Sequence, residues 1–276
     1  MCVREGSVYT GPVKQVVFDL AGTTVDFGCM APVAAFIEGF KKMGVDITDI
    51  QAREPMGMEK RAHIRAIAAM DGVDQIWRNI HGQSITEDDI EAMYQLFVPL
   101  LLEVLPDYSD TVPGLAETLA FLDDRQILYS ATTGYFRQAT DIVLGKAAQH
   151  GFHPLATCCA TEVPAGRPEP WMIYRCMQDL RTFPIAAVVN VGDTKVDVES
   201  GRNAGSWSIG VAGSGNMMGV TLEEFKRMDE TQLFERIGNA RQALNDAGAH
   251  YVIDQISELP EVIEKIEHRL SAGERP

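Results

Sequence analysis

The stretch VVFDLAGTT, residues 16–24, places a single carboxylate directly after a run of apolar side chains. Continuous apolar runs are typical of strands that are buried on both faces of a parallel sheet. Asp19 follows this run, so it lies at the carboxyl end of the predicted strand, where open α/β sheets bind their ligands. Asp19 is therefore the best candidate nucleophile in the chain.

Further strand-like runs alternate with helical segments along the chain. They are short and apolar, with β-branched residues in places, and the expected strands span residues 15–20, 127–130, 187–191, 207–211 and 251–253. This alternation predicts an α/β fold with a parallel sheet. Thr133 and Asp193 follow two of these runs as Asp19 follows the first, so the sequence predicts that the three side chains converge.

About a hundred residues separate the first two expected strands, far more than the dozen or so that a parallel crossover needs. Apolar residues recur there at helical spacing, in two runs: Val33, Phe36, Ile37 and Phe40, and then Ile90, Met93, Tyr94, Phe97, Leu101 and Val104. Thr48 with Gln51 and Thr86 with Asp89 have capping-box spacing, although only the first pair ends in the preferred Glu or Gln. The sequence predicts a helical unit inserted between these strands.

The composition is that of an ordinary soluble globular protein, with 276 residues and 46% apolar content. The net charge of −15 argues against a nucleic-acid surface, although one pocket can still be locally positive. No uninterrupted apolar stretch of about 18 residues occurs, and the first residues lack the hydrophobic centre of a signal peptide, so we expect a cytoplasmic protein without membrane attachment. The five cysteines, two of them adjacent at Cys158 and Cys159, indicate neither a disulfide framework nor a zinc site.

Five segments resemble, in the same order, those of the phosphonatases, a branch of the haloacid dehalogenase (HAD) superfamily that hydrolyses the C–P bond of phosphonoacetaldehyde. They are DLAGTTVDFGC at 19–29, PMG at 55–57 with Lys60 and His63, TTGY at 132–135, VPAGRP at 163–168, and VGDT at 191–194 with Asp197. The resemblance implies a Rossmann-like α/β core with a parallel sheet, residues 1–27 and 108–276, and an inserted α-helical cap domain, residues 28–107. It also implies a homodimer formed through the cap.

Ala21 stands where HAD phosphatases carry a second Asp that protonates an oxygen leaving group. Loss of that acid fits a reaction in which carbon departs from phosphorus and its electrons are accepted elsewhere. The resemblance supplies the acceptor, an imine formed between Lys60 and the aldehyde of the substrate. Ala21 thus favours a phosphonate substrate over a phosphate ester.

A carboxylate can attack an anionic phosphoryl group only when a cation neutralises the phosphoryl oxygens. Mg²⁺ suits this task because it prefers hard oxygen ligands and accepts a phosphoryl oxygen into its shell. We expect Asp19 and Asp193 to bind it, and the resemblance adds the backbone carbonyl of Ala21. Asp197 either supports this site or is an exposed acid at the start of a helix.

Thr133 and Arg167 are the expected phosphoryl-binding residues. Thr133 would donate a hydrogen bond, and Arg167 would pair bidentately, as guanidinium geometry favours. Taken alone, residues 132–134 are equally typical of a strand-end turn, and an Arg before a proline is usually a surface residue.

Lys60 is the residue on which the phosphonatase hypothesis depends. An amine that attacks an aldehyde must be unprotonated, so its pKa must fall from about 10.4 toward roughly 7 to 8. His63 lies on the same face of the predicted helix and could transfer protons during imine formation. The alternative is a solvated Lys and a partly exposed His on an amphipathic helix. By resemblance, Cys29, Met56 and Tyr135 line the pocket, although Cys and Met are often simple core residues.

Three functions follow as hypotheses: a phosphonatase acting on a small phosphonate, a HAD phosphomonoesterase or phosphomutase, and a catalytically silent phosphate-binding relative. The Gly-rich stretch at 213–219 lacks the dinucleotide-binding spacing and is expected to be a connecting loop. Residues 230–247 are expected to form an exposed amphipathic helix. An apolar helix containing Phe36 and Phe40 fits a dimer interface, but it fits a core-facing stripe equally well.

Overall fold

The computed structural model describes residues 8–276. Within these residues, six strands run parallel in one sheet, in the order β3-β2-β1-β4-β5-β6. Their bounds are β1 Gln15–Asp19, β2 Leu128–Thr133, β3 Thr157–Cys159, β4 Val188–Gly192, β5 Trp207–Val211 and β6 Tyr251–Ile253. The predicted α/β fold with a parallel sheet is confirmed.

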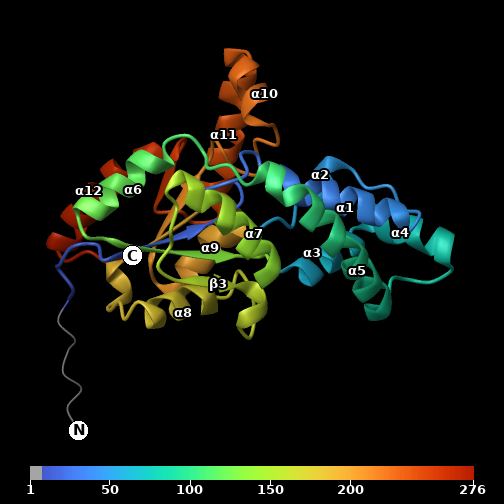
Figure 1. Cartoon of the computed structure of the whole chain (residues 1–276), viewed down its shortest axis with the longest axis horizontal. Helices are drawn as coiled ribbons and strands as arrows, with labels where there is room; N and C mark the ends of the chain where they lie inside the picture. The colour runs from blue at the N-terminus through green and yellow to red at the C-terminus, as the bar shows by residue number, and fades with distance from the viewer. Residues whose placement is uncertain (1–7) are drawn as a thin grey trace, which may run out of the picture.

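Helices flank this sheet and continue the chain between its strands (Figure 1). They are α6 Leu115–Asp124, α7 Arg137–Ala147, α8 Trp171–Asp179, α9 Lys195–Ala204, α10 Leu222–Arg227, α11 Glu230–Asp246 and α12 Leu259–Ser271. Helices α8 and α9 pack on each other and on the sheet, whereas α6 packs with α12. Every residue of β1, β4 and β5 is buried, as expected for parallel strands covered on both faces.

Six α-helices lie between β1 and β2, where the sequence predicts an insertion, and the first five of them form a helical group. These five are α1 Met30–Lys42, α2 Asp49–Arg53, α3 Lys60–Ala68, α4 Asp71–His81 and α5 Glu87–Val104, and they lie together on the right of Figure 1. Helix α1 packs against α5, and the ring of Phe36 stacks on that of Phe97 with a centroid distance of 4.4 Å. Both expected capping boxes are present, at Thr48 and at Thr86. Apolar packing between its helices thus holds the insertion together.

The remaining elements can be compared with the expectations from the sequence. The chain between β5 and β6 forms the expected loop at 213–219, then α10, which stands out at the top of Figure 1, and α11, which matches the helix expected at 230–247. Phe36 and Phe40, each 1% exposed, face the interior of the insertion. No helix within residues 8–276 is long and apolar enough to cross a membrane.

Candidate active site

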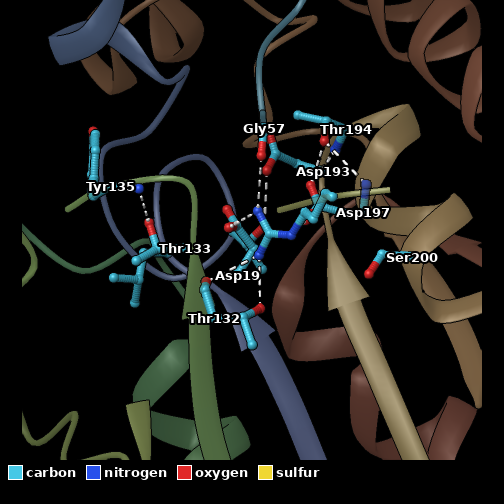
Figure 2. A network of polar contacts seen from close by, with 12 residues as sticks. Asp19, Gly57, Thr132, Thr133, Tyr135, Asp193, Thr194, Asp197 and Ser200 are labelled. Atoms are coloured by element: carbon cyan, nitrogen blue, oxygen red, sulfur yellow. Dashed lines mark hydrogen bonds and ion pairs between the residues drawn. The ribbon is translucent and has the colours of Figure 1, made fainter. Parts of the chain in front are cut away.

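Three carboxylates meet at the carboxyl edge of the sheet. Asp19 is the last residue of β1, Asp193 follows β4, and Asp197 lies in the first turn of α9. Parallel pairing of β1 with β4 brings these ends together, and one carboxylate oxygen of each residue lies within 4.8 Å of the others. All three are buried, and Figure 2 shows them side by side. The convergence of Asp19 and Asp193 is as the sequence predicts.

Glycine backbone next to this cluster lets the carboxylates approach closely. Gly22 has φ +90°, and a Cβ there would lie 2.4 Å from Oδ2 of Asp193. A Cβ on Gly192 would lie 2.3 Å from that of Asp197. Side chains at these positions would therefore displace the carboxylates, so the cluster requires glycine at both.

Arg167 joins two of the carboxylates. Its Nη1 lies 2.7 Å from Oδ1 of Asp19, and its Nε lies 2.8 Å from Oδ1 of Asp197. Its Nη2 donates to the hydroxyl of Thr132 at 2.7 Å and to the carbonyl of Thr132 at 3.0 Å. Arg167 is 5% exposed and Asp197 is 1% exposed, so neither is the surface residue that the alternative interpretations require.

The cluster carries more negative charge than Arg167 can balance. Burial raises the pKa of Asp19 to about 7, and Asp197 adds to this rise while Arg167 opposes it. Burial, together with Asp19 and Asp197, also raises the pKa of Asp193 well above its ordinary value. Closely spaced, buried oxygen ligands with excess negative charge suit a divalent cation such as Mg²⁺. The residues present therefore fit a metal ion.

Next to the carboxylates lies a small cavity. Its walls include eight of the residues that the sequence singles out: Asp19, Ala21, Cys29, Met56, Lys60, Thr133, Tyr135 and Arg167. Asp19, Ala21, Thr133 and Arg167 come from the sheet side. Met56, in the turn between α2 and α3, and Lys60, at the start of α3, come from the insertion. The helical insertion therefore closes the cavity over the carboxyl edge of the sheet.

Lys60 is a buried amine without an ion-pair partner among residues 8–276. Its Nζ lies 5.0 Å from the ring centroid of Tyr135 and 5.6 Å from that of Phe36. Burial lowers the pKa of Lys60, although Cys29 and Asp19 partly oppose the shift. Lys60 is also the first residue of α3, where the helix dipole disfavours a cation. Burial and the helix dipole both favour the neutral amine.

His63, three residues after Lys60 in α3, is fully buried and does not line the cavity. Its Nε2 is 2.9 Å from the carbonyl oxygen of Ala52, which can only accept, so this nitrogen carries a proton. Burial, with Lys60 nearby, lowers the pKa of His63 well below its ordinary value. Its Nδ1 has no hydrogen-bond partner in the described part of the chain. His63 is therefore a neutral imidazole with one free acceptor nitrogen.

Thr133 and Tyr135 lie at the end of β2, on the left of Figure 2. The Thr133 hydroxyl accepts a hydrogen bond of 3.1 Å from the backbone N–H of Tyr135, so its own proton remains free to donate. The Tyr135 hydroxyl is buried and lacks a partner within residues 8–276. Both residues line the cavity, and neither hydroxyl donates a hydrogen bond within the described part of the chain.

Several supporting residues were not predicted to belong to the site. The Thr23 hydroxyl donates to Oδ1 of Asp193 at 3.0 Å, and the backbone N–H of Asn216 donates to Oδ2 at 2.7 Å. The Thr194 hydroxyl donates to Oδ2 of Asp197 at 2.5 Å within a capping box. The spacing of Thr194 and Asp197 matches a helix-capping pattern that can be recognised in the sequence. No local pattern points to Asn216, because its partner is distant in sequence.

We expect replacement of Lys60 by Met to stabilise the protein at pH 7, by about 1–3 kcal/mol, because it removes an unpaired buried amine from an apolar pocket. At pH values between the lowered pKa of Lys60 in the folded protein and its pKa of about 10.4 in the unfolded chain, Lys60 binds more protons in the unfolded chain. Wild-type stability should therefore rise with pH, and the advantage of Lys60→Met should shrink toward pH 10. Urea denaturation at pH 7 and pH 10 measures this. Lys41→Met, on the exposed face of α1, should change stability little at either pH.

Comparison with known proteins places this site in a family. Residues 13–205 match the haloacid dehalogenase-like hydrolases, so the chain belongs to that class of hydrolase. It is 42% identical over 268 residues to a phosphonoacetaldehyde hydrolase of Syntrophobacter fumaroxidans, covering 97% of each chain. It is 43% identical over 265 residues to that of Paraburkholderia phytofirmans, covering 96% of this chain and 99% of that one. Within its class, the chain belongs to the phosphonoacetaldehyde hydrolase family, as the five segments predict.

A solved structure supports the same placement. The crystal structure of a phosphonoacetaldehyde hydrolase-like protein from Oleispira antarctica aligns over 100% of both chains, with 36% sequence identity and a TM-score of 0.96. A hydrolase from Pseudomonas syringae, at 19% identity and a TM-score of 0.69, shares the fold.

Proposed function

We propose that this enzyme hydrolyses the C–P bond of phosphonoacetaldehyde to acetaldehyde and phosphate. One observation carries the proposal: a buried amine without an ion pair, Lys60, and a buried carboxylate, Asp19, line the same small cavity. The amine can hold an aldehyde and the carboxylate can attack phosphorus. The names of the homologous hydrolases point to the same substrate.

The first step is condensation of Lys60 with the aldehyde. The neutral Nζ adds to the carbonyl carbon, and loss of water from the carbinolamine gives an imine that is protonated on nitrogen. The free Nδ1 of His63 can accept and return the protons that these steps exchange. The protonated imine then draws electrons from the neighbouring carbon.

The second step is attack of the Asp19 carboxylate on phosphorus. As the new O–P bond forms, the C–P bond breaks, and its electron pair moves toward the imine to leave a neutral enamine on Lys60. Thr133 and Arg167 would bind the phosphoryl oxygens. Because an enamine needs no protonation on departure, Ala21 suffices where phosphatases carry an acid.

The third step restores the enzyme. Protonation of the enamine carbon regenerates the imine, and water releases acetaldehyde from Lys60. A second water attacks the aspartyl phosphate, which returns Asp19 and releases phosphate.

Asp19 and Asp193, with the backbone carbonyl of Ala21, are the proposed ligands of Mg²⁺, and Asp197 holds Arg167 beside them. The bound ion would neutralise phosphoryl oxygens so that the Asp19 carboxylate can approach. A homodimer, a cytoplasmic location and a place in 2-aminoethylphosphonate breakdown are proposed from family resemblance. The buried Phe36 and Phe40 do not contribute to a dimer interface.

The proposal is tested by incubating the protein with phosphonoacetaldehyde and Mg²⁺, with and without EDTA. We expect acetaldehyde and phosphate in equal amounts, and loss of both with EDTA. Hydrolysis of simple phosphate esters without C–P cleavage would favour the phosphomonoesterase alternative. Phosphate binding without turnover of either substrate would favour a silent relative.

We expect Ala21→Asp to leave C–P cleavage no faster than in the wild type. The added acid has no alkoxide to protonate, and it adds a carboxylate near the already acidic cluster. The initial rate of acetaldehyde release measures this, with Ala21→Asn as the uncharged control. A large gain in rate would contradict the role assigned to Ala21.

A further inference from the structure

The loop at 213–219 forms part of the wall around the carboxylates. The backbone N–H of Asn216 donates to Oδ2 of Asp193 at 2.7 Å, and the Ser214 hydroxyl donates to the carbonyl of Gly22 at 2.8 Å. A Cβ on Gly215 would lie 2.6 Å from that of Asp193, so the loop backbone passes directly over this side chain. The stretch that looks like a plain connection in the sequence therefore touches an expected metal ligand.

Arg53, at the end of α2 in the helical insertion, holds the same loop. Its Nη1 lies 3.2 Å from Oδ1 of Asn216, and the Nδ2 of Asn216 donates to the Arg53 carbonyl at 3.0 Å. The same Nη1 lies 2.7 Å from the carbonyl of Gly28 and 3.3 Å from that of Cys29. Arg53 is 8% exposed and Asn216 is 7% exposed. The two residues thus form a reciprocal, buried contact between the insertion and the core.

The geometry of this contact bears on Asp193. Thr23 holds its Oδ1 and Asn216 holds its Oδ2, so both oxygens have fixed donors. The side chain of Asn216 is held at both its oxygen and its nitrogen, which fixes the direction of its backbone N–H. Residues that orient a metal-binding carboxylate in this way commonly change metal affinity by about 10- to 100-fold.

We propose that Asn216 and Arg53 are positioning residues for Asp193, and that their contact couples the placement of the helical insertion to the metal site. This inference rests on the proposed function only for the position of the metal site, and not for the reaction. Arg53 reaches Gly28 and Asn216 through Nη1 while its Nε pairs with Asp49, and a lysine ammonium cannot reproduce this forked geometry. The loop at 213–219 is therefore part of the active site.

The test compares Mn²⁺ binding in Asn216→Ala, Arg53→Lys and the double variant, with free Mn²⁺ followed by electron paramagnetic resonance. We expect the dissociation constant to rise about tenfold in each single variant. Because both substitutions act through one contact, the double variant should bind Mn²⁺ no more weakly than the single variant with the lower affinity. Asp49→Ala is the matched control: it removes the partly exposed partner of the Arg53 Nε, 2.7 Å away, and should change affinity less than twofold.

Thermal melting checks that each variant is folded, and Asn216→Gln, which displaces the amide by one methylene, replaces Asn216→Ala if the latter unfolds. Wild-type affinity in both single variants, or fully additive losses in the double variant, would overturn the inference. Weakened Mn²⁺ binding in a protein that does not cleave phosphonoacetaldehyde would support the inference and reject the proposed function. Cleavage by the wild type, with unchanged affinity in the variants, would do the reverse.

Discussion

Lys60→Arg is expected to reduce phosphonoacetaldehyde turnover by on the order of 10⁴-fold. Arginine keeps a positive charge in the pocket, but its guanidinium stays protonated and cannot form an imine. Without the imine, the electrons of the C–P bond have no acceptor, and Asp19 would have to expel a carbanion. The loss should therefore appear in kcat, measured as acetaldehyde release at saturating substrate.

The control for Lys60→Arg is Lys41→Arg, which makes the same substitution on the exposed surface of α1. It should retain wild-type turnover. Because Lys60 is buried in a small cavity, a melting curve must establish that Lys60→Arg is folded. A folded Lys60→Arg variant with more than about a tenth of wild-type turnover would rule out covalent catalysis by Lys60.

Asp19→Asn is expected to abolish phosphate release, again by on the order of 10⁴-fold, while imine formation at Lys60 survives. The amide has nearly the shape of the carboxylate but cannot act as the nucleophile toward phosphorus. Lys60 makes no ion pair with Asp19, so its reaction with the aldehyde does not need the Asp19 charge. Phosphate release reports the second step, and borohydride trapping of substrate on Lys60 reports the first.

Asp179→Asn is the matched control, because Asp179 is an exposed aspartate that also pairs with an arginine, Arg175, at 3.1 Å. It should leave both steps intact. Loss of phosphate release together with loss of trapping in Asp19→Asn would show that Asp19 is needed before C–P cleavage. Undiminished phosphate release would place the nucleophile elsewhere.

The sequence predicts most of the sheet, because parallel strands buried on both faces leave uninterrupted apolar runs. The expected strands at 207–211 and 251–253 match β5 and β6, and the others differ at their ends by one to three residues. The edge strand β3, Thr157–Cys159, was missed because three residues carry too little pattern to be recognised. In the sequence, Cys158 and Cys159 stand out as adjacent thiols rather than as strand residues.

The site is predictable where its chemistry lies in local motifs at strand ends. Asp19, Thr133 and Asp193 share that context, and parallel pairing brings them to one edge. The burial of Lys60 and His63 could not be read from α3 alone, because it depends on Phe36 and Tyr135 from distant segments. The contact between Asn216 and Asp193 is likewise long-range, and no sequence pattern in the loop at 213–219 predicts it.

The most direct test of the mechanism is the mass of the peptide containing Lys60 after incubation with phosphonoacetaldehyde and borohydride. We expect a reduced two-carbon or phosphono adduct on Lys60 in the wild type, and the phosphono adduct alone in Asp19→Asn, where the C–P bond stays intact. An unmodified Lys60 peptide under conditions in which acetaldehyde and phosphate are released would contradict the Schiff-base mechanism, because C–P cleavage would then proceed without the imine.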